Sequence, residues 1–93
     1  MTPEQIQTIE ESVKTKIQAL VYTGLEILDI NSKYDSDAKV LTIHLVMPEL
    51  FVANLNLINE RRAFYGDLAD IEMDIAQEFT IVSDDIFIQP EYK

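Results

Sequence analysis

Apolar residues recur at helical spacing near the start of the chain: Ile6, Ile9, Val13, Ile17 and Leu20. This stripe predicts an amphipathic helix that turns one face toward a core. Its start is marked by Thr2 as N-cap, Pro3 at the first helical position and Gln5, which completes a capping box. Gly24 follows the stripe, and we expect it to take the left-handed position that ends the helix.

The next apolar pattern favours two strands around a turn. Residues 25–34 alternate loosely, an Asp-Ser-Asp triplet at 35–37 has turn chemistry, and residues 40–47 are strongly apolar and β-branched. We expect an antiparallel hairpin. Both faces of the second strand carry apolar residues, which predicts that this strand is central or covered on both sides.

Two more helices and a last strand complete the pattern. Pro48 stops the second strand, and Glu49 suits the first turn of a helix rich in apolar residues. Gly66 is expected to end that helix and Asp67 to cap a third one, with apolar residues at spacings of three and four: Leu68, Ile71, Ile75 and Phe79. The final strand, marked by Ile81 and then by Ile86, Phe87 and Ile88, is expected ahead of Pro90.

These elements predict an α+β fold: one small domain over residues 1–93, in the order α-β-β-α-α-β, with a third strand packed against the helices. With 47% hydrophobic residues in 93 positions, the chain can fill one core. The order, with an aspartate-containing turn in the hairpin, resembles the type II KH-like fold seen in the ribosome-binding factor A family. RNA-binding members of that fold class use basic surfaces and a Gly-x-x-Gly loop. This sequence has neither, so the resemblance implies the fold and not RNA binding.

Charge and composition narrow the classes of partner. The formal net charge of −10 and a pI near 4.2 oppose direct binding to nucleic acid or anionic membranes, since both interactions depend on lysine and arginine. No cysteine is present, which excludes disulfides and thiolate sites. We see no signal peptide pattern and no apolar run long enough for a membrane span, and we expect a soluble cytoplasmic protein.

The acidic residues are unevenly distributed along the chain. Residues 63–92 contain eight acids and no lysine or arginine. Four of these acids follow one another at intervals of three, four and four, which predicts a row along the third helix: Asp67, Asp70, Asp74 and Glu78. Like charges four residues apart destabilise a helix by roughly 0.5 kcal/mol in total here. A basic partner or a hard cation could offset this cost, and a solvated helix edge could tolerate it.

The sequence offers no catalytic, cofactor or metal signature. His44 is the only histidine, and two isolated glycines, Gly24 and Gly66, cannot form a phosphate-binding loop. The turn at 35–37 lacks the glycine and the glutamate of a calcium loop. Carboxylates in one helical row span too great a length to enclose one ion. We therefore expect no enzyme activity, no cofactor and no metal.

The leading hypothesis is a small acidic module that binds a basic partner protein and occludes its surface. An inhibitor or immunity-type protein, such as a phage protein that mimics nucleic-acid charge, is its concrete form. The expected partner-binding residues are the row on the third helix and two acids beyond it: Asp67, Asp70, Asp74, Glu78, Asp84 and Asp85.

Alternatives remain open. The first is a self-associating structural subunit, for example of a phage particle or secretion machine. It would form a homodimer or larger assembly through a hairpin edge or the apolar second helix: Leu50, Phe51, Val52, Leu55, Leu57 and Ile58. High charge that serves only solubility, or an unrecognised enzyme or metal-binding domain, would also fit the sequence.

Overall fold

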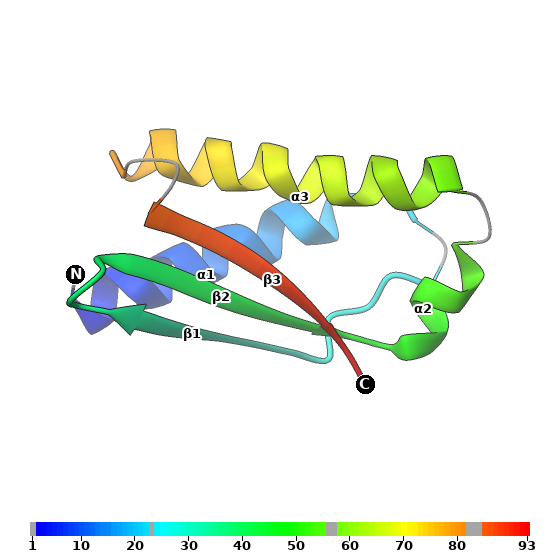
Figure 1. The fold of residues 1–93 in the computed structure, drawn as a ribbon, viewed down its shortest axis with the longest axis horizontal. Helices are drawn as coiled ribbons and strands as arrows, with labels where there is room; N and C mark the ends of the chain where they lie inside the picture. Colours follow the sequence, from blue (N-terminus) through cyan, green and yellow to red (C-terminus); the bar gives the residue numbers. More distant parts are fainter. Residues whose placement is uncertain (1, 23, 56–57, 82–84) are drawn as a thin grey trace.

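A three-stranded mixed sheet and a layer of helices form the protein (Figure 1). The computed structural model describes residues 2–22, 24–55, 58–81 and 85–93, without the side chains of Val52, Asn54, Ile58 and Asn59. The elements follow in the order α1 (Pro3–Gln18), β1 (Asp29–Asp35), β2 (Val40–Met47), α2 (Glu49–Asn54), α3 (Ile58–Glu78) and β3 (Ile86–Tyr92). The α+β class and the order α-β-β-α-α-β, both predicted from the sequence pattern, are confirmed.

The sheet has β2 at its centre, between β1 and β3. β1 and β2 form the expected antiparallel hairpin, in which Asn31 lies opposite His44. β3 runs parallel to β2, and Gln89 lies on the other side of His44. The carboxylate of Asp35 begins the turn by accepting the backbone N–H groups of Asp37 and Ala38 at 3.0 and 3.1 Å, as its turn chemistry predicts.

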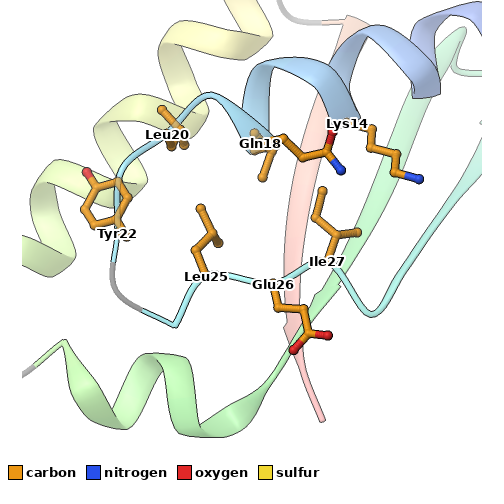
Figure 2. A pocket seen from close by; sticks show the side chains of 8 residues that line it. Lys14, Gln18, Leu20, Tyr22, Leu25, Glu26 and Ile27 are labelled. Carbon is orange, nitrogen blue, oxygen red and sulfur yellow. The ribbon is translucent and has the colours of Figure 1, made fainter.

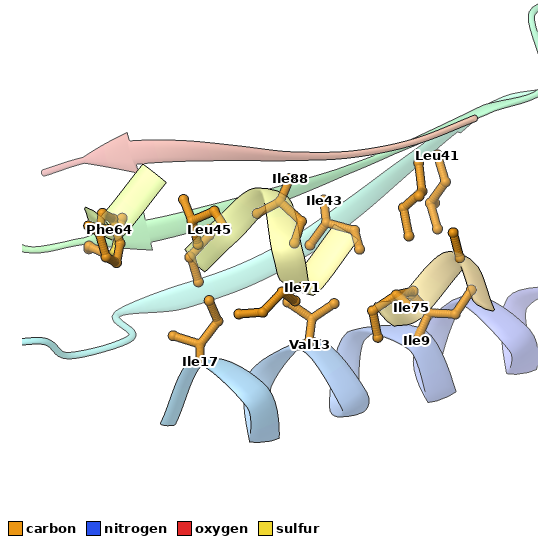
Figure 3. Packing of buried hydrophobic residues seen from close by; sticks show 14 of the residues in the cluster. Ile9, Val13, Ile17, Leu41, Ile43, Leu45, Phe64, Ile71, Ile75 and Ile88 are labelled. Atoms are coloured by element: carbon orange, nitrogen blue, oxygen red, sulfur yellow. The ribbon is translucent and has the colours of Figure 1, made fainter. Parts of the chain in front are cut away.

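Helices α1 and α3 cover one face of the sheet (Figure 1). Alternate residues of β2 point into this layer, where Ile43 and Leu45 are fully buried. They meet Ile9, Val13 and Ile17 of α1, together with Phe64, Ile71 and Ile75 of α3 (Figure 3). The other face of β2 is only partly covered at Thr42 and His44. Of the two alternatives predicted for this strand, the central position is confirmed, because β2 lies between β1 and β3.

The first helix begins as predicted and ends earlier. Thr2 is the N-cap, and the capping box with Gln5 is complete. The helix ends at Gln18 with Ala19 as C-cap, and Leu20 closes a tighter turn by donating its N–H to Ile17 at 3.0 Å. Gly24 is therefore not the cap, although its φ of 82° does lie in the left-handed region, in the turn before β1. That strand begins at Asp29 and not at residue 25.

The boundary between the second and third helices is also different from the prediction. The break follows Asn54, and α3 runs without interruption through Gly66, which does not end a helix. A glycine inside a helix costs about 1 kcal/mol, and the buried neighbours Phe64 and Leu68 offset this cost by anchoring the helix on both sides. Asp67 is consequently no N-cap but an interior residue of α3.

The arginine pair at 61–62 lies near the start of α3, since this helix begins at Ile58. Arg61 donates its Nε–H to the backbone carbonyl of Leu55 at 3.0 Å, which links α3 to the end of α2.

Candidate functional site

The acidic row of α3 lies along the side of the helix that meets α1. All four members, Asp67, Asp70, Asp74 and Glu78, are on one continuous helix, so the predicted alignment holds. Contacts to α1 and to the segment after it fix the two ends of the row, whereas the middle of the row faces solvent. The row therefore contains two kinds of carboxylate.

Asp67 is held at one end of the row. The hydroxyl of Tyr22 donates to Asp67 Oδ2 at 2.5 Å, and the ring of Tyr22 packs edge-on against Phe51 and Phe64, with centroids 6.3 and 5.4 Å away. Burial, and next the bond to Asp67, raise the pKa of Tyr22 from 10.0 to about 12. This carboxylate stabilises the contact between α3 and the segment that follows α1.

Glu78 is held at the other end. Its Oε2 accepts a hydrogen bond from the Ser12 hydroxyl at 3.1 Å and lies 3.6 Å from Lys16 Nζ. Both partners belong to α1, so Glu78 joins the two long helices. The ion pair joins a half-buried lysine to an exposed glutamate near the surface and contributes less than about 1 kcal/mol.

Asp70 and Asp74 lie between these two anchors. Both are exposed, and within the described part of the chain neither has a hydrogen bond or an ion pair. They stand four residues apart on a helix whose opposite side is packed into the core. These two carboxylates are the members of the row that remain available to a partner.

Of the two acids beyond α3, only Asp85 is within the described part of the chain. Asp84 lies outside the described residues. Asp85 is half-buried directly before β3, on a different element from the four acids of the helix. The candidate surface is therefore centred on the middle of α3.

No protein-family model, curated protein or solved structure matches the chain. In the described ranges, no group of three or more potential ligands is arranged to hold a metal ion. None of the described helices combines the length and apolar character that a bilayer crossing requires.

Another acid of α3, Glu72, has a role that the sequence did not indicate. Its Oε1 accepts the backbone N–H of Ile88 in β3 at 2.8 Å. Burial raises the pKa of the Glu72 carboxyl, and the hydrogen bond from Ile88 opposes part of that shift. The pairing depends on how α3 crosses the sheet edge, which residue spacing along the helix does not reveal.

His44 lies on the face of the sheet opposite the helices. Its Nδ1 is 2.8 Å from Glu91 Oε1, and Asn31 and Gln89 flank it in register. The two groups form a carboxylate–imidazole pair on the open face. A nucleophilic serine or cysteine is needed for triad chemistry, and the sequence places none in this row of the sheet.

A solvent-open pocket of about 380 Å³ lies between the end of α1 and the segment leading to β1 (Figure 2). Leu25 and Ile27 point from that segment toward α1, while Lys14 and Glu26 add one charge of each sign. The pocket is small, and its polar groups do not converge on one point. It provides no specific chemistry for a ligand.

Proposed function

We propose that this protein is an acidic binding module that docks the middle of α3 against a basic surface of another protein. The observation that carries the proposal is the pair Asp70 and Asp74, exposed between two carboxylates that are already bonded. Asp67 and Glu78 hold the helix in place. Asp70 and Asp74 are left for an external cation such as lysine or arginine.

The charge around the pair supports this assignment. From residue 63 to the end of α3 the chain has five acids and no base: Asp67, Asp70, Glu72, Asp74 and Glu78. A surface of one sign accelerates encounter with an oppositely charged partner and repels nucleic acid. Because the helix is fixed by its buried side, little conformational entropy is lost when its carboxylates are engaged.

Occlusion is the mechanism that follows from such a surface. A row of carboxylates on a rigid helix can cover a basic groove and exclude the anion that the groove normally binds. Nucleases and nucleic-acid-guided effectors have grooves of this kind, so an inhibitor of such a protein is the concrete form of the proposal.

The test compares three forms of the protein in capture from a host lysate. These are the wild type, an Asp70→Lys/Asp74→Lys variant, and a Glu26→Lys/Asp37→Lys control with the same change in net charge at exposed positions away from α3. We expect a basic protein to be retained by the wild type and by the control, and lost by the α3 variant. Its purified form should bind more weakly as salt is added.

Two results would contradict the proposal. One is equal retention by all three forms. The other is a captured protein whose affinity for the wild type does not change with ionic strength, because contact between opposite charges near a surface is screened by salt.

Self-association is a second candidate function, on a surface different from the second helix. Phe51 and Leu55 of the apolar segment are buried in the core, and only Leu50 among its described side chains is largely exposed. The side chains of Val52, Leu57 and Ile58 lie outside the described part of the chain, so among the described ones Leu50 alone is left as surplus apolar surface. The observation that favours self-association is the outer edge of β1, which lies at the end of the sheet.

A further inference from the structure

The two edges of the sheet differ in how much hydrogen-bonding capacity they leave open. β3 contains Pro90, which has no N–H to donate, and Glu72 of α3 accepts the N–H of Ile88 at 2.8 Å. Proline and a covering helix are both ways to prevent strand addition. Among the described residues, no other element covers the outer edge of β1 in this way. Within the sheet, β1 forms backbone hydrogen bonds with β2 alone.

The pairing of β1 with β2 determines which backbone N–H and C=O groups of β1 point outward, away from the sheet. The backbone N–H of Ile30 donates to Asp29 Oδ1, a side chain of its own strand, at 2.9 Å. This bond identifies Ile30 as a residue whose peptide groups point away from β2. Because the orientation alternates along an antiparallel strand, Ser32 and Tyr34 also direct their N–H and C=O groups outward.

We propose that two copies of this chain pair through β1 as antiparallel strands around a two-fold axis at Asn31. Ile30 of each copy then exchanges backbone hydrogen bonds with Ser32 of the other. Asn31 meets Asn31, and Asp29 of each copy lies opposite Lys33 of the other. The result is a continuous six-stranded sheet with both helix layers on one side. This inference rests on self-association, the second candidate function, and is independent of the acidic surface on α3.

Charge complementarity selects this register. Backbone groups that point outward recur every two residues along β1. The two-fold axis can therefore pass through a residue, but not between two neighbouring residues. An axis at Ser32 places Asp29 opposite Asp35, and an axis at Lys33 places the two lysines opposite each other. The axis at Asn31 creates two pairs of opposite charge, and cross-strand pairs of opposite charge stabilise a sheet whereas like charges destabilise it.

The helix layer is compatible with the same axis. Ser12 and Lys16 of α1 face α3, so Glu10 and Lys14 lie on the opposite flank of α1, toward the free edge of β1. Tyr34 lines a cavity with Ile9, and Ile27 lines another with Lys14 and Gln18, so α1 runs antiparallel to β1 with its middle above the strand. A two-fold axis at Asn31 therefore brings the charged outer flank of α1 toward the same flank of the second copy, in antiparallel direction.

Pairing also gives the carboxylate of Asp29 a new partner. In the single chain it accepts the Ile30 N–H and the side-chain amide of Asn31. In the dimer the Ile30 N–H is taken by the second strand, and the carboxylate is released to Lys33 of the second copy. Neither group is left without a partner by the exchange.

The absence of cysteine from the sequence makes the register directly testable. With the axis at Asn31, the two copies of position 31 form a non-hydrogen-bonded pair with Cα atoms about 4.5 Å apart. That separation lies within the range of about 4.4–6.8 Å that a disulfide bridges. We therefore expect Asn31→Cys to form a covalent dimer rapidly under mild oxidation, and the control Lys33→Cys to do so at least about tenfold more slowly.

Sedimentation of the wild type over a range of concentrations tests self-association itself. We expect the mass to rise from 10.7 kDa toward twice that value. Lys33→Asp should weaken association at least threefold, and the exchange Asp29→Lys/Lys33→Asp should restore it, because each pair then regains opposite charges. Restoration by the exchange would support the register independently of the disulfide.

The possible failures are distinguishable. A wild type that stays monomeric at all concentrations overturns both self-association and this register. A wild type that dimerises while Lys33→Cys is oxidised as fast as Asn31→Cys overturns the register and leaves self-association standing. Neither result affects the docking of α3, which is measured with the variants of Asp70 and Asp74.

Discussion

The two faces of the sheet are made from the same strands and have different surroundings. On β2, Leu41, Ile43 and Leu45 face the helices and are fully buried, while the intervening Thr42 and His44 face the other way and stay partly exposed. A domain of this size has enough apolar residues to cover one face, and that face receives both long helices. The difference indicates that residues on the covered face determine the stability of the protein. Residues on the open face can be substituted with little loss of stability.

The largest expected effect comes from the covered face. Ile43→Ala should lower the free energy of unfolding by about 3 kcal/mol, because it removes buried methyl groups and leaves a cavity in the core. The matched variant Thr42→Ala, one residue away on the open face, should lower it by less than about 1 kcal/mol. Urea denaturation measures both, and similar losses for the two variants would contradict the comparison.

A smaller effect is expected where the covered layer meets the acidic row. Tyr22→Phe keeps the ring contacts with Phe51 and Phe64 but removes the hydroxyl that Asp67 accepts. The loss should be about 1 kcal/mol, which lowers the melting temperature by about 4–8 °C in a domain of this size.

The pH dependence of Tyr22 gives that contact a second test. Its pKa is about 12 in the folded protein and 10.0 in the unfolded chain, so the unfolded chain loses the proton first. The stability contributed by the protonated hydroxyl is complete below pH 10 and is lost as the pH rises toward 12. The difference between the wild type and Tyr22→Phe should therefore shrink over this interval. A difference that stays constant to pH 12 would contradict the assigned bond.

Glu72 lies at the boundary between the covered layer and the β3 edge, and its removal should be slightly stabilising. Burial raises the folded-state pKa of Glu72 above the unfolded value of 4.5, so the unfolded chain loses its proton first. The resulting penalty on folding is absent below pH 4.5 and grows as the pH rises through the folded-state pKa. Glu72→Gln keeps an oxygen for the Ile88 N–H. We expect its melting temperature at pH 7 to exceed that of the wild type by less than about 4 °C, and the gain to vanish near pH 4.

A control variant separates the charge from the hydrogen bond. Glu72→Leu also removes the charge but leaves the Ile88 N–H without its acceptor, so it should be less stable than Glu72→Gln at pH 7. Equal stability of the two variants would show that the bond from Ile88 has no energetic role.

The smallest effect is expected on the open face. Glu91→Gln keeps an oxygen beside His44 Nδ1, and the pair is partly exposed. The free energy of unfolding should change by less than about 0.5 kcal/mol. A loss above 1 kcal/mol in urea denaturation would mean that the open face contributes to stability nearly as the covered face does, and the comparison would fail.

Local signals in the sequence predicted the parts of the fold that depend on neighbouring residues. The capping box at Thr2 fixes the start of α1, and the β-branched run gives β2 its bounds without error. Gly66 misled the prediction, because a glycine ends a helix only if tertiary packing does not continue it, and Phe64 and Leu68 pack on either side. Pro90 lies inside β3 for a related reason, since an edge strand tolerates a missing N–H.

The sequence predicted that the four acids of the candidate surface align along one helix. It did not predict which of them are bonded to other parts of the protein and which are exposed. Residue spacing placed Asp67, Asp70, Asp74 and Glu78 in one row. The partners that distinguish them, Tyr22 for Asp67 and Ser12 for Glu78, are 45 and 66 positions away along the chain. Contacts between such distant residues depend on how α1 lies against α3, which no local pattern records.

The parallel pairing of β2 with β3 has a consequence for the order in which the chain folds. The hairpin of β1 and β2 joins close neighbours, whereas His44 and Glu91 are 47 positions apart and meet only after α2 and α3 have crossed over the sheet. Closing so long a connection is entropically slow. Until β3 arrives, the inner edge of β2 stays unpaired, and the nascent chain is at that stage most exposed to association with other unfinished chains.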